Sequence, residues 1–237
     1  LATYRAVNTA GTLALARQAA AAGVKRFILL STIKVHGEAT APGSAFSASS
    51  PLDPQDPYAQ SKAEAELGLR ELAADSAMEI VILRPPLVYG PGVKANFARL
   101  LRAVERGWPL PLGRLTENRR SLLAVDNLVD LIRRCLDHPA AAGQAFVACD
   151  GEDLSTAALL QRLARANGRS LRLLPVPVAL LQTLARLSDR SGGRSASFAR
   201  LSDNLQVDMR ATCALLGWQP PLDVDHALRA CFANNHR

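Results

Sequence analysis

The sequence predicts an α/β fold with a parallel sheet that helices cover on both faces. Segments typical of helices alternate with short apolar segments along most of the 237 residues. This order favours parallel strands joined by helices. The apolar segments are continuous rather than alternating with polar residues, as expected for strands that are buried on both faces. Apolar residues make up 49% of the chain, enough to form a substantial core.

The first half of the chain contains two helical segments, each followed by an apolar strand. Gly23 follows the first helical segment, at a position where glycine often ends a helix, and the loop before the second helical segment is rich in Pro, Ser and Ala. The expected elements are, in order, a helix over 2–22 ended by Gly23, a buried strand over 25–31, a loop over 38–57, a helix over 58–75 and a buried strand over 78–85.

The second half continues the alternation with shorter elements. Two of its helices have a polar residue at the position where a side-chain oxygen can cap the first turn. We expect a helix over 96–107, a strand over 120–125, a helix over 127–138 capped by Asp126, a strand over 144–149, a helix over 155–168 capped by Ser155, a strand, turn and helix within 171–187, and short helices within 208–218 and 223–234.

Composition limits the classes of function. The net charge of +7 fits either nucleic acid or an acidic small substrate, but the basic residues are spread along the chain. The dense cluster NRRS at 118–121 suits one or two phosphates better than a nucleic acid, which makes a nucleic-acid binder the weakest alternative. No segment is long and apolar enough to span a bilayer, and no signal peptide is expected.

The four cysteines indicate a reducing compartment. Cys135, Cys149, Cys213 and Cys231 show no CxxC spacing, and the four histidines are scattered. We therefore expect buried, reduced thiols, no metal site and a cytoplasmic location.

Tyr58 and Lys62 are the first candidates for chemistry. They stand four residues apart at the start of the predicted helix over 58–75, so their side chains share one face. An ammonium close to a phenol favours the phenolate and lowers its pKa. Such a tyrosine can take a proton from an alcohol near neutral pH. An ordinary helix start with an exposed pair is the alternative, and the spacing alone is only suggestive.

Hydroxyl residues at a strand end strengthen this interpretation. Ser31 and Thr32 end the first apolar strand, and ligands of parallel sheets bind beyond the carboxyl ends of strands. Lys34 follows in a chain with only four lysines, either as part of the site or as a solvated loop residue. The second apolar strand ends in Pro85 and Pro86, which supplies another such edge or a simple turn.

The ordered set of motifs resembles the extended short-chain dehydrogenase/reductases of the nucleotide-sugar epimerase/dehydratase type. Each motif is weak alone, but together they occur in the family's order and cover almost the whole chain. The matching pieces are NTAGT at 8–12, GVKRFILLST at 23–32, VHG at 35–37, YAQSK at 58–62, LRPPLVYGPG at 83–92, NF at 96–97, RRSLLAVDNLVD at 119–130 and LGWQP at 216–220.

The resemblance implies a Rossmann-type sheet, incomplete at the N-terminus, and a smaller C-terminal α+β substrate domain. Residues 1–90 would be the remainder of the dinucleotide-binding domain, with NAD or NADP as cofactor. Residues 91–237 would mainly form the substrate domain for a nucleotide-diphosphate sugar, with 121–140 returning to the first domain. A homodimer through the helices 2–22 and 58–75 is also implied.

Carried over to this sequence, the resemblance also assigns roles to single residues. Tyr58 would be the catalytic acid/base, Lys62 would bind the nicotinamide ribose and lower the tyrosine pKa, and Thr32 would hydrogen-bond the substrate oxygen. The implied cofactor contacts are Ser31, Tyr58, Lys62, Pro85, Leu87 and Val88. The implied substrate contacts are Thr32, Lys34, Asn96, Arg120 and Arg200, and Asn8 stands where the family has an asparagine that helps to order the site.

One departure from the family is large. The family begins with a strand and a GxxGxxG loop, which binds the cofactor pyrophosphate, and these 237 residues contain no such loop. We therefore expect the chain to be a fragment that lacks the first strand–helix units. On its own it is expected to bind NAD or NADP poorly or not at all.

Within this family three reactions compete. Dehydratases carry Thr-Asp-Glu at the strand end, whereas Thr32 is followed by Ile33 and Lys34, which makes a dehydratase the weakest of the three. A 4-epimerase acting on a UDP-hexose or UDP-N-acetylhexosamine in surface polysaccharide biosynthesis is our leading hypothesis. A 4-ketoreductase or dehydrogenase uses the same visible residues. A catalytically inactive fragment or binding protein of the same fold is the alternative from another class.

Overall fold

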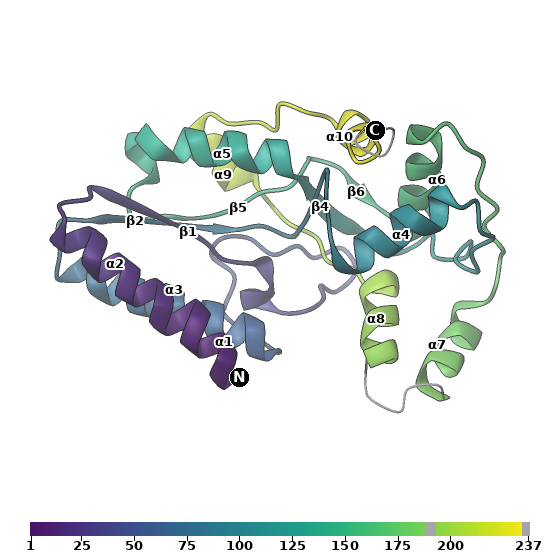
Figure 1. Cartoon of the computed structure of the whole chain (residues 1–237), viewed down its shortest axis with the longest axis horizontal. Helices are drawn as coiled ribbons and strands as arrows, with labels where there is room; N and C mark the ends of the chain where they lie inside the picture. The colour runs from purple at the N-terminus through teal and green to yellow at the C-terminus, as the bar shows by residue number, and fades with distance from the viewer. Residues whose placement is uncertain (188–192, 234–237) are drawn as a thin grey trace.

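The chain forms two small sheets flanked by helices (Figure 1). The computed structural model describes residues 1–187 and 193–233, with only the backbone described over 193–197. None of the helices in these residues is long and apolar enough to cross a membrane.

The chain opens with one long helical segment. It consists of α1 (Ala2–Tyr4), seven residues of π-helix in η1 (Arg5–Gly11) and α2 (Thr12–Ala21). Gly23 follows with a φ of +77°, a left-handed conformation that glycine adopts readily, as the sequence predicted. The π-helical turns were not predicted. They bring Asn8 and Thr9 against Ser61 of the helix over Pro57–Ala74.

The first sheet is parallel, which confirms the predicted α/β class. It has the order β1 (Arg26–Leu30), β2 (Glu79–Arg84), β5 (Ala145–Val147), and both pairings are parallel. Alternate residues of β2 face opposite layers of helix because side chains alternate along a strand. Ile80 and Ile82 pack with α2 and with α3 (Pro57–Ala74). Val81 and Leu83 pack with α5 (Val125–Asp137) and α9 (Arg210–Leu216).

Helices α2 and α3 lie against one face of this sheet and cross at a glycine. A Cβ at Gly68 would meet the side chain of Leu13 at 2.8 Å, so a larger residue at this position would force the Leu13 side chain to move. In Figure 1 the two helices run side by side below the sheet, and α5 and α9 lie above it.

The second sheet supports a separate cluster of helices. It has the order β3 (Leu87–Tyr89), β4 (Arg120–Ala124), β6 (Asp153–Leu154), with β3 parallel and β6 antiparallel to β4. The other elements are η2 (Ile33–His36), α4 (Ala95–Glu105), η3 (Pro139–Ala141), α6 (Thr156–Ala166), α7 (Val178–Leu187), α8 (Gly193–Ser202) and α10 (Val224–Ala230). Helices α4, α6 and α10 share one apolar core with β3 and β4.

Two predicted helix caps have different outcomes. Ser155 caps α6, as predicted, because its hydroxyl accepts a hydrogen bond from the Ala158 amide at 3.1 Å. The prediction that Asp126 caps α5 is wrong. The helix already begins at Val125 directly after β4, and the amide of Ala124 donates to the distant Asp150 carboxylate at 2.8 Å.

Candidate active site

A cavity of about 530 Å³ lies where the two sheets meet, beyond the carboxyl ends of β1 and β2. Elements far apart in the sequence form its wall, from η2 and the start of α3 to β3, β4 and the starts of α4 and α6. Eight of the residues proposed from the sequence line it: Thr32, Lys34, Tyr58, Leu87, Val88, Asn96, Arg120 and Arg200.

Tyr58 reaches the cavity from the first turn of α3. Asp56 caps this helix, since its carboxylate accepts from the Ala59 amide at 2.7 Å, and Pro57 stands at the first helical position. The Tyr58 ring meets the Tyr4 ring edge to face, with centroids 6.0 Å apart. Burial, followed by the Asp56 carboxylate, raises the pKa of Tyr58, and the Lys34 ammonium acts in the opposite direction.

Thr32 is fixed where the parallel pairing of β1 and β2 ends. The Ser31 amide donates to the Leu83 carbonyl at 2.7 Å, and the Ile33 amide donates to the Pro85 carbonyl at 2.9 Å. These bonds continue the pairing past the last strand residue and hold Thr32 between them. The Thr32 hydroxyl accepts from the Lys34 amide at 3.3 Å, and 8% of the residue is exposed on the cavity wall.

Lys34 lies between two carboxylates on the cavity wall. Its ammonium donates to Glu38 at 2.6 Å and to Asp56 at 2.8 Å. The pKa of Asp56 is lowered, because the bonds from Lys34 and the Ala59 amide outweigh the opposing effect of burial. The sequence proposed Lys34 as a substrate contact, and the structure gives it two anionic partners within the protein.

Lys62 and Ser31 do not line the cavity. The Lys62 ammonium donates to the Leu30 carbonyl at 2.9 Å, and burial lowers its pKa. The Ser31 hydroxyl donates to the buried Glu66 carboxylate. From the Tyr58–Lys62 spacing we expected a lowered tyrosine pKa. In the structure the pKa of Tyr58 is raised, and the cation that opposes this rise is Lys34.

Behind the cavity, a buried charged network joins the elements that carry Thr32 and Tyr58. Arg84, at the end of β2, pairs with Glu66 of α3 at 2.6 Å, and both side chains are almost fully buried. Arg84 also contacts the His36 ring at 3.0 Å and the Ala48 carbonyl at 2.8 Å. The network therefore fixes β2, α3 and η2 relative to one another.

Asn8 connects the π-helical turns to the same helix. Its amide donates to the Ser61 hydroxyl at 3.0 Å, and that hydroxyl donates to the Tyr58 carbonyl at 2.7 Å. The structure thus brings Asn8 close to the backbone of Tyr58 without placing it on the cavity wall. The ordering role that the resemblance implies for Asn8 stays a prediction.

Basic residues also line the cavity. Arg120 at the start of β4 is half-buried, and its guanidinium donates to the Asp203 carbonyl at 2.9 Å. Burial lowers the pKa of Arg120, while Asp203 and Glu38 oppose that effect. Arg200 of α8 and Lys94 line the same cavity, and we refer to these three basic residues as the basic wall. Three cations that line one cavity suit an anionic ligand that carries more than one negative charge.

Helix α4 begins on this basic wall. Asn96 lies in its first turn, and the preceding Ala95 has a φ of +56°, which is unusual for a residue with a side chain. Free backbone amides at a helix start favour anions. Asn96 is therefore well placed for a phosphate. Pro85, proposed as a cofactor contact, is not on the cavity wall, whereas Pro86 and Leu87 are.

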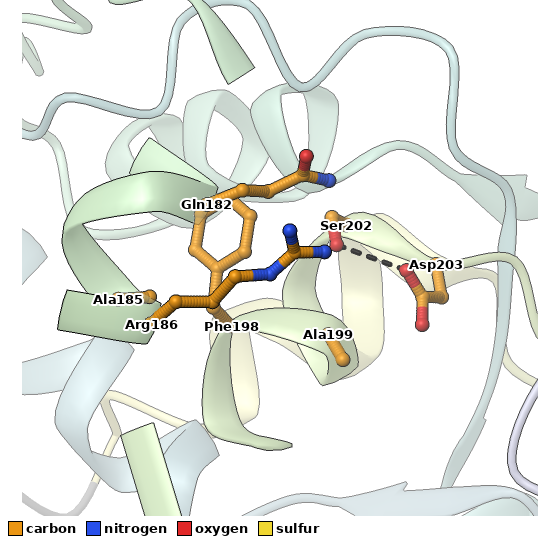
Figure 2. A pocket seen from close by; sticks show the side chains of 7 residues that line it. All are labelled: Gln182, Ala185, Arg186, Phe198, Ala199, Ser202 and Asp203. Carbon is orange, nitrogen blue, oxygen red and sulfur yellow. Dashed lines mark hydrogen bonds between the residues drawn. The ribbon is translucent and has the colours of Figure 1, made fainter. Parts of the chain in front are cut away.

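A second, shallower pocket opens between α7 and α8 (Figure 2). It is lined by Gln182, Ala185, Arg186, Phe198, Ala199, Ser202 and Asp203. Asp203 links it to the main cavity, because its backbone carbonyl accepts the bond from Arg120. None of these seven residues was proposed as a site residue from the sequence.

Several cavity residues were not proposed as site residues from the sequence, namely Tyr4, Glu38, Asp56, Lys94, Thr156 and Ser155, which was predicted only as a helix cap. Asp56 had a detectable signal, because Asp before Pro is a common helix start. Tyr4 and Glu38 reach the cavity only through tertiary packing. Across residues 1–187 and 193–233, no group of three or more His, Cys, Asp or Glu could hold a metal ion.

The model of the NAD dependent epimerase/dehydratase family matches residues 1–149. A UDP-glucose 4-epimerase from Vibrio cholerae is 51% identical over 221 residues, which cover 93% of this chain and 66% of that protein. The chain therefore spans less than two thirds of that relative's length. A GDP-6-deoxy-D-mannose reductase from Pseudomonas aeruginosa is 26% identical and matches 96% of this chain and 72% of that protein.

Solved structures share the fold at lower identity. A UDP-glucuronic acid 4-epimerase from Bacillus cereus in complex with NAD has a TM-score of 0.73 and 20% identity, covering 95% of this chain and 66% of that one. RMD from Pseudomonas aeruginosa, complexed with NADPH, has a TM-score of 0.72 and 21% identity, covering 94% and 70%. These similarities show a Rossmann-like α/β fold.

Proposed function

The chain belongs to the NAD dependent epimerase/dehydratase family, and on that premise we propose that it carries out the reversible 4-epimerisation of a nucleotide sugar. The substrate class is a UDP-hexose or a UDP-N-acetylhexosamine, and the cofactor is NAD or NADP. We further propose that the product serves surface polysaccharide biosynthesis.

One observation carries the proposal: a single cavity joins the Tyr58 and Thr32 side chains to a basic wall that contains Arg120 and Arg200. The first pair suits a sugar hydroxyl and the second suits a diphosphate. The 51% identity to the Vibrio cholerae UDP-glucose 4-epimerase supports the same substrate class.

Tyr58 is the proposed acid/base. Its phenolate takes the proton of the C4 hydroxyl while a hydride leaves C4, which converts the alcohol to a ketone. When the hydride returns to the opposite face of the sugar, Tyr58 gives the proton back and the inverted alcohol forms. Thr32 donates a hydrogen bond to the same oxygen and keeps it in reach of the phenol.

NAD or NADP, when bound, supplies the two-electron chemistry by accepting the hydride and returning it. We propose Pro85, Leu87, Val88, Lys62 and Ser31 as its contacts. Leu87 fits this role best, since it is 39% exposed and apolar on the cavity wall. Lys62 and Ser31 already bind groups of the protein. Their main proposed contribution to the cofactor site is therefore to hold the end of β1 in place.

The basic wall is proposed to hold the diphosphate. Asn96 would donate from the start of α4, and the guanidinium groups of Arg120 and Arg200 would pair with the phosphates. Lys34 remains a proposed contact, although its two carboxylate partners leave it less charge to offer a substrate.

We propose a homodimer through α2 and α3. Large apolar residues are exposed on these helices and on η1, which precedes α2: Leu15 of α2 is 59% accessible, Leu67 of α3 51% and Val7 of η1 67%. A second copy of this chain would cover them. We also propose a cytoplasmic enzyme, since its four cysteines are free and nucleotide sugars are soluble anions.

The test uses the longest polypeptide that the gene encodes, supplied with UDP-glucose or UDP-N-acetylglucosamine. The absorbance of reduced nicotinamide and the identity of the product sugar are followed together. We expect the C4-inverted sugar without net consumption of cofactor. Stoichiometric cofactor turnover would instead favour a 4-ketoreductase or dehydrogenase, which uses the same residues.

A further inference from the structure

Three charged residues on the cavity wall form a cluster beside the proposed acid/base Tyr58. Lys34 of η2 lies between Glu38 and Asp56, and all three side chains are between a quarter and a third exposed. The Lys34 side chain extends from η2, which follows β1, to Asp56 at the start of α3.

The contacts of Asp56 tie this cluster to the acid/base residue. One carboxylate oxygen accepts from the Ala59 amide at 2.7 Å and caps α3, while the other accepts from Lys34 at 2.8 Å. Each oxygen thus has its own partner, and Tyr58 stands two residues further on. Asp56 cannot turn away without uncapping the helix that carries Tyr58.

Lys34 also contacts Thr32, at the strand end that faces the site. Its amide donates to the Thr32 hydroxyl at 3.3 Å, while its ammonium binds Asp56. One residue therefore joins the strand end that carries Thr32 to the helix start that carries Tyr58. We propose that the Lys34–Asp56 ion pair is a positioning pair that sets the protonation equilibrium of Tyr58.

This inference rests on the acid/base role proposed for Tyr58. The charged or titratable neighbours of Tyr58 come from three elements: Asp56 from the α3 cap, Lys34 from η2 and Tyr4 from α1. Glu38, Lys94, Arg120 and Arg200 line the same cavity. The Asp56 carboxylate raises the pKa of Tyr58 and the Lys34 ammonium lowers it, so the pair acts on the phenol in opposite directions.

The experiment follows the phenol directly. The chain has three tyrosines, so labelling with [¹³Cζ]tyrosine gives three NMR signals, and Tyr4→Phe and Tyr58→Phe assign two of them. The pH midpoint of the Tyr58 signal is measured in the 237-residue chain. Lys34→Met is expected to shift it to higher pH, and Asp56→Asn to lower pH. Asparagine caps a helix as well as aspartate does, so α3 is preserved.

Matched controls separate this role from a general change in charge. Lys34→Arg keeps the cation and is expected to restore the wild-type midpoint. Lys25→Met and Asp75→Asn make the same charge changes at exposed positions outside the cavity, and they are expected to leave the midpoint in place. Midpoints for Lys34→Met and Asp56→Asn that equal those of their controls would overturn the proposal.

The NMR midpoint does not depend on turnover, so the two proposals fail separately. If the midpoints shift and no sugar is epimerised, the pair controls Tyr58 and the proposed function is wrong. If Tyr58→Phe abolishes epimerisation and the midpoints do not shift, the proposed function survives and the positioning role is wrong. In an active protein, the pH dependence of kcat is expected to move in the same directions as the midpoints.

Discussion

Tyr58 stands in an environment that disfavours its own phenolate. Burial and the Asp56 carboxylate both raise its pKa, and the Lys34 ammonium opposes them. A base with a raised pKa works best when something bound in the cavity adds positive charge nearby. The basic wall and the cofactor proposed for this site are sources of such charge.

Replacing Tyr58 by Phe is expected to reduce turnover by about 10²- to 10⁴-fold, the usual contribution of a positioned acid/base. Binding of the nucleotide sugar should persist, because the basic wall is untouched. Tyr4→Phe removes the other phenol of the cavity and should cost much less. Turnover retained by Tyr58→Phe would contradict the acid/base role.

Arg120→Gln is expected to weaken binding of a nucleotide sugar about 10- to 100-fold, as loss of a charge-assisted hydrogen bond usually does. Calorimetry with the uridine diphosphate sugar measures it. Arg119→Gln is the matched control, because Arg119 is exposed and does not line the cavity. Equal losses in both variants would show that only overall charge matters.

At the scale of elements, the buried network fixes the strand ends and the helix that carry the site. Glu66, Arg84 and His36 come from α3, β2 and η2. His36 binds the Pro51 carbonyl through Nδ1, which must donate, so Nε2 accepts from Arg84 and the ring is neutral. The network is thus built for one protonation state.

Glu66→Gln should lower the free energy of unfolding by about 3–5 kcal/mol, because it leaves the buried Arg84 charge without its partner. Urea denaturation measures the change. Glu71→Gln, at an exposed position of the same helix, should change stability by less than about 0.5 kcal/mol. A loss for Glu66→Gln as small as for Glu71→Gln would mean that the ion pair does not hold the layer together.

His36 should make stability fall in mild acid. Burial, chiefly, and Arg84 lower its pKa, so between this value and about 6.5 the unfolded chain binds more protons than the folded one. The free energy of unfolding therefore decreases as pH falls below about 6.5. His36→Asn should flatten this dependence, as seen in denaturation at several pH values. An unchanged slope in that variant would exclude His36 as its source.

Periodicity correctly predicts the elements whose secondary structure is determined by their own residues. The strand over 25–31, the helix over 58–75 and the Ser155 cap follow from local patterns, and each is present. Asp126 looked like a cap, but the tertiary partner Asp150 binds the preceding amide instead. Strands β3 and β6 are too short for periodicity, and they exist only because β4 lies between them.

The residues of the candidate site likewise fall into two groups, those that local motifs predict and those that only tertiary packing brings to the cavity. Eight of the residues chosen from the sequence line the cavity, because motifs at strand ends and helix starts meet there. Glu38 and Tyr4 could not be predicted, since only the packing of the loop over 38–57 and of α1 brings them to the wall. Lys34 was singled out for its rarity, and its carboxylate partners emerge only from the structure.

Across the whole molecule, the proposed acid/base residues and the proposed diphosphate-binding residues are carried by different sets of elements. The parallel sheet β1–β2–β5 carries Thr32 and, through α3, Tyr58, while α4, β4 and α8 supply the basic wall. Strand β5 belongs to the first sheet and helix α9 packs on it, although both fall within residues 91–237, expected mainly in the substrate domain. The division therefore crosses the chain several times.

The 237-residue chain is expected to bind nucleotide sugar more tightly than NAD or NADP. Its cavity has the basic wall for a diphosphate sugar, but its sequence contains no glycine-rich loop for the cofactor pyrophosphate. Calorimetry with each ligand provides the comparison. Tight cofactor binding by this chain would contradict the expectation.

The central claim is that a hydride leaves C4 of the sugar and returns to the same carbon with Tyr58 as acid/base. The direct measurement supplies UDP-glucose deuterated at C4 to the longest polypeptide that the gene encodes, together with NAD, and analyses the product by NMR. The account predicts the C4-inverted sugar with its deuterium retained, and no such product from Tyr58→Phe. An inverted sugar that has lost its deuterium, or equal inversion by Tyr58→Phe, would contradict it.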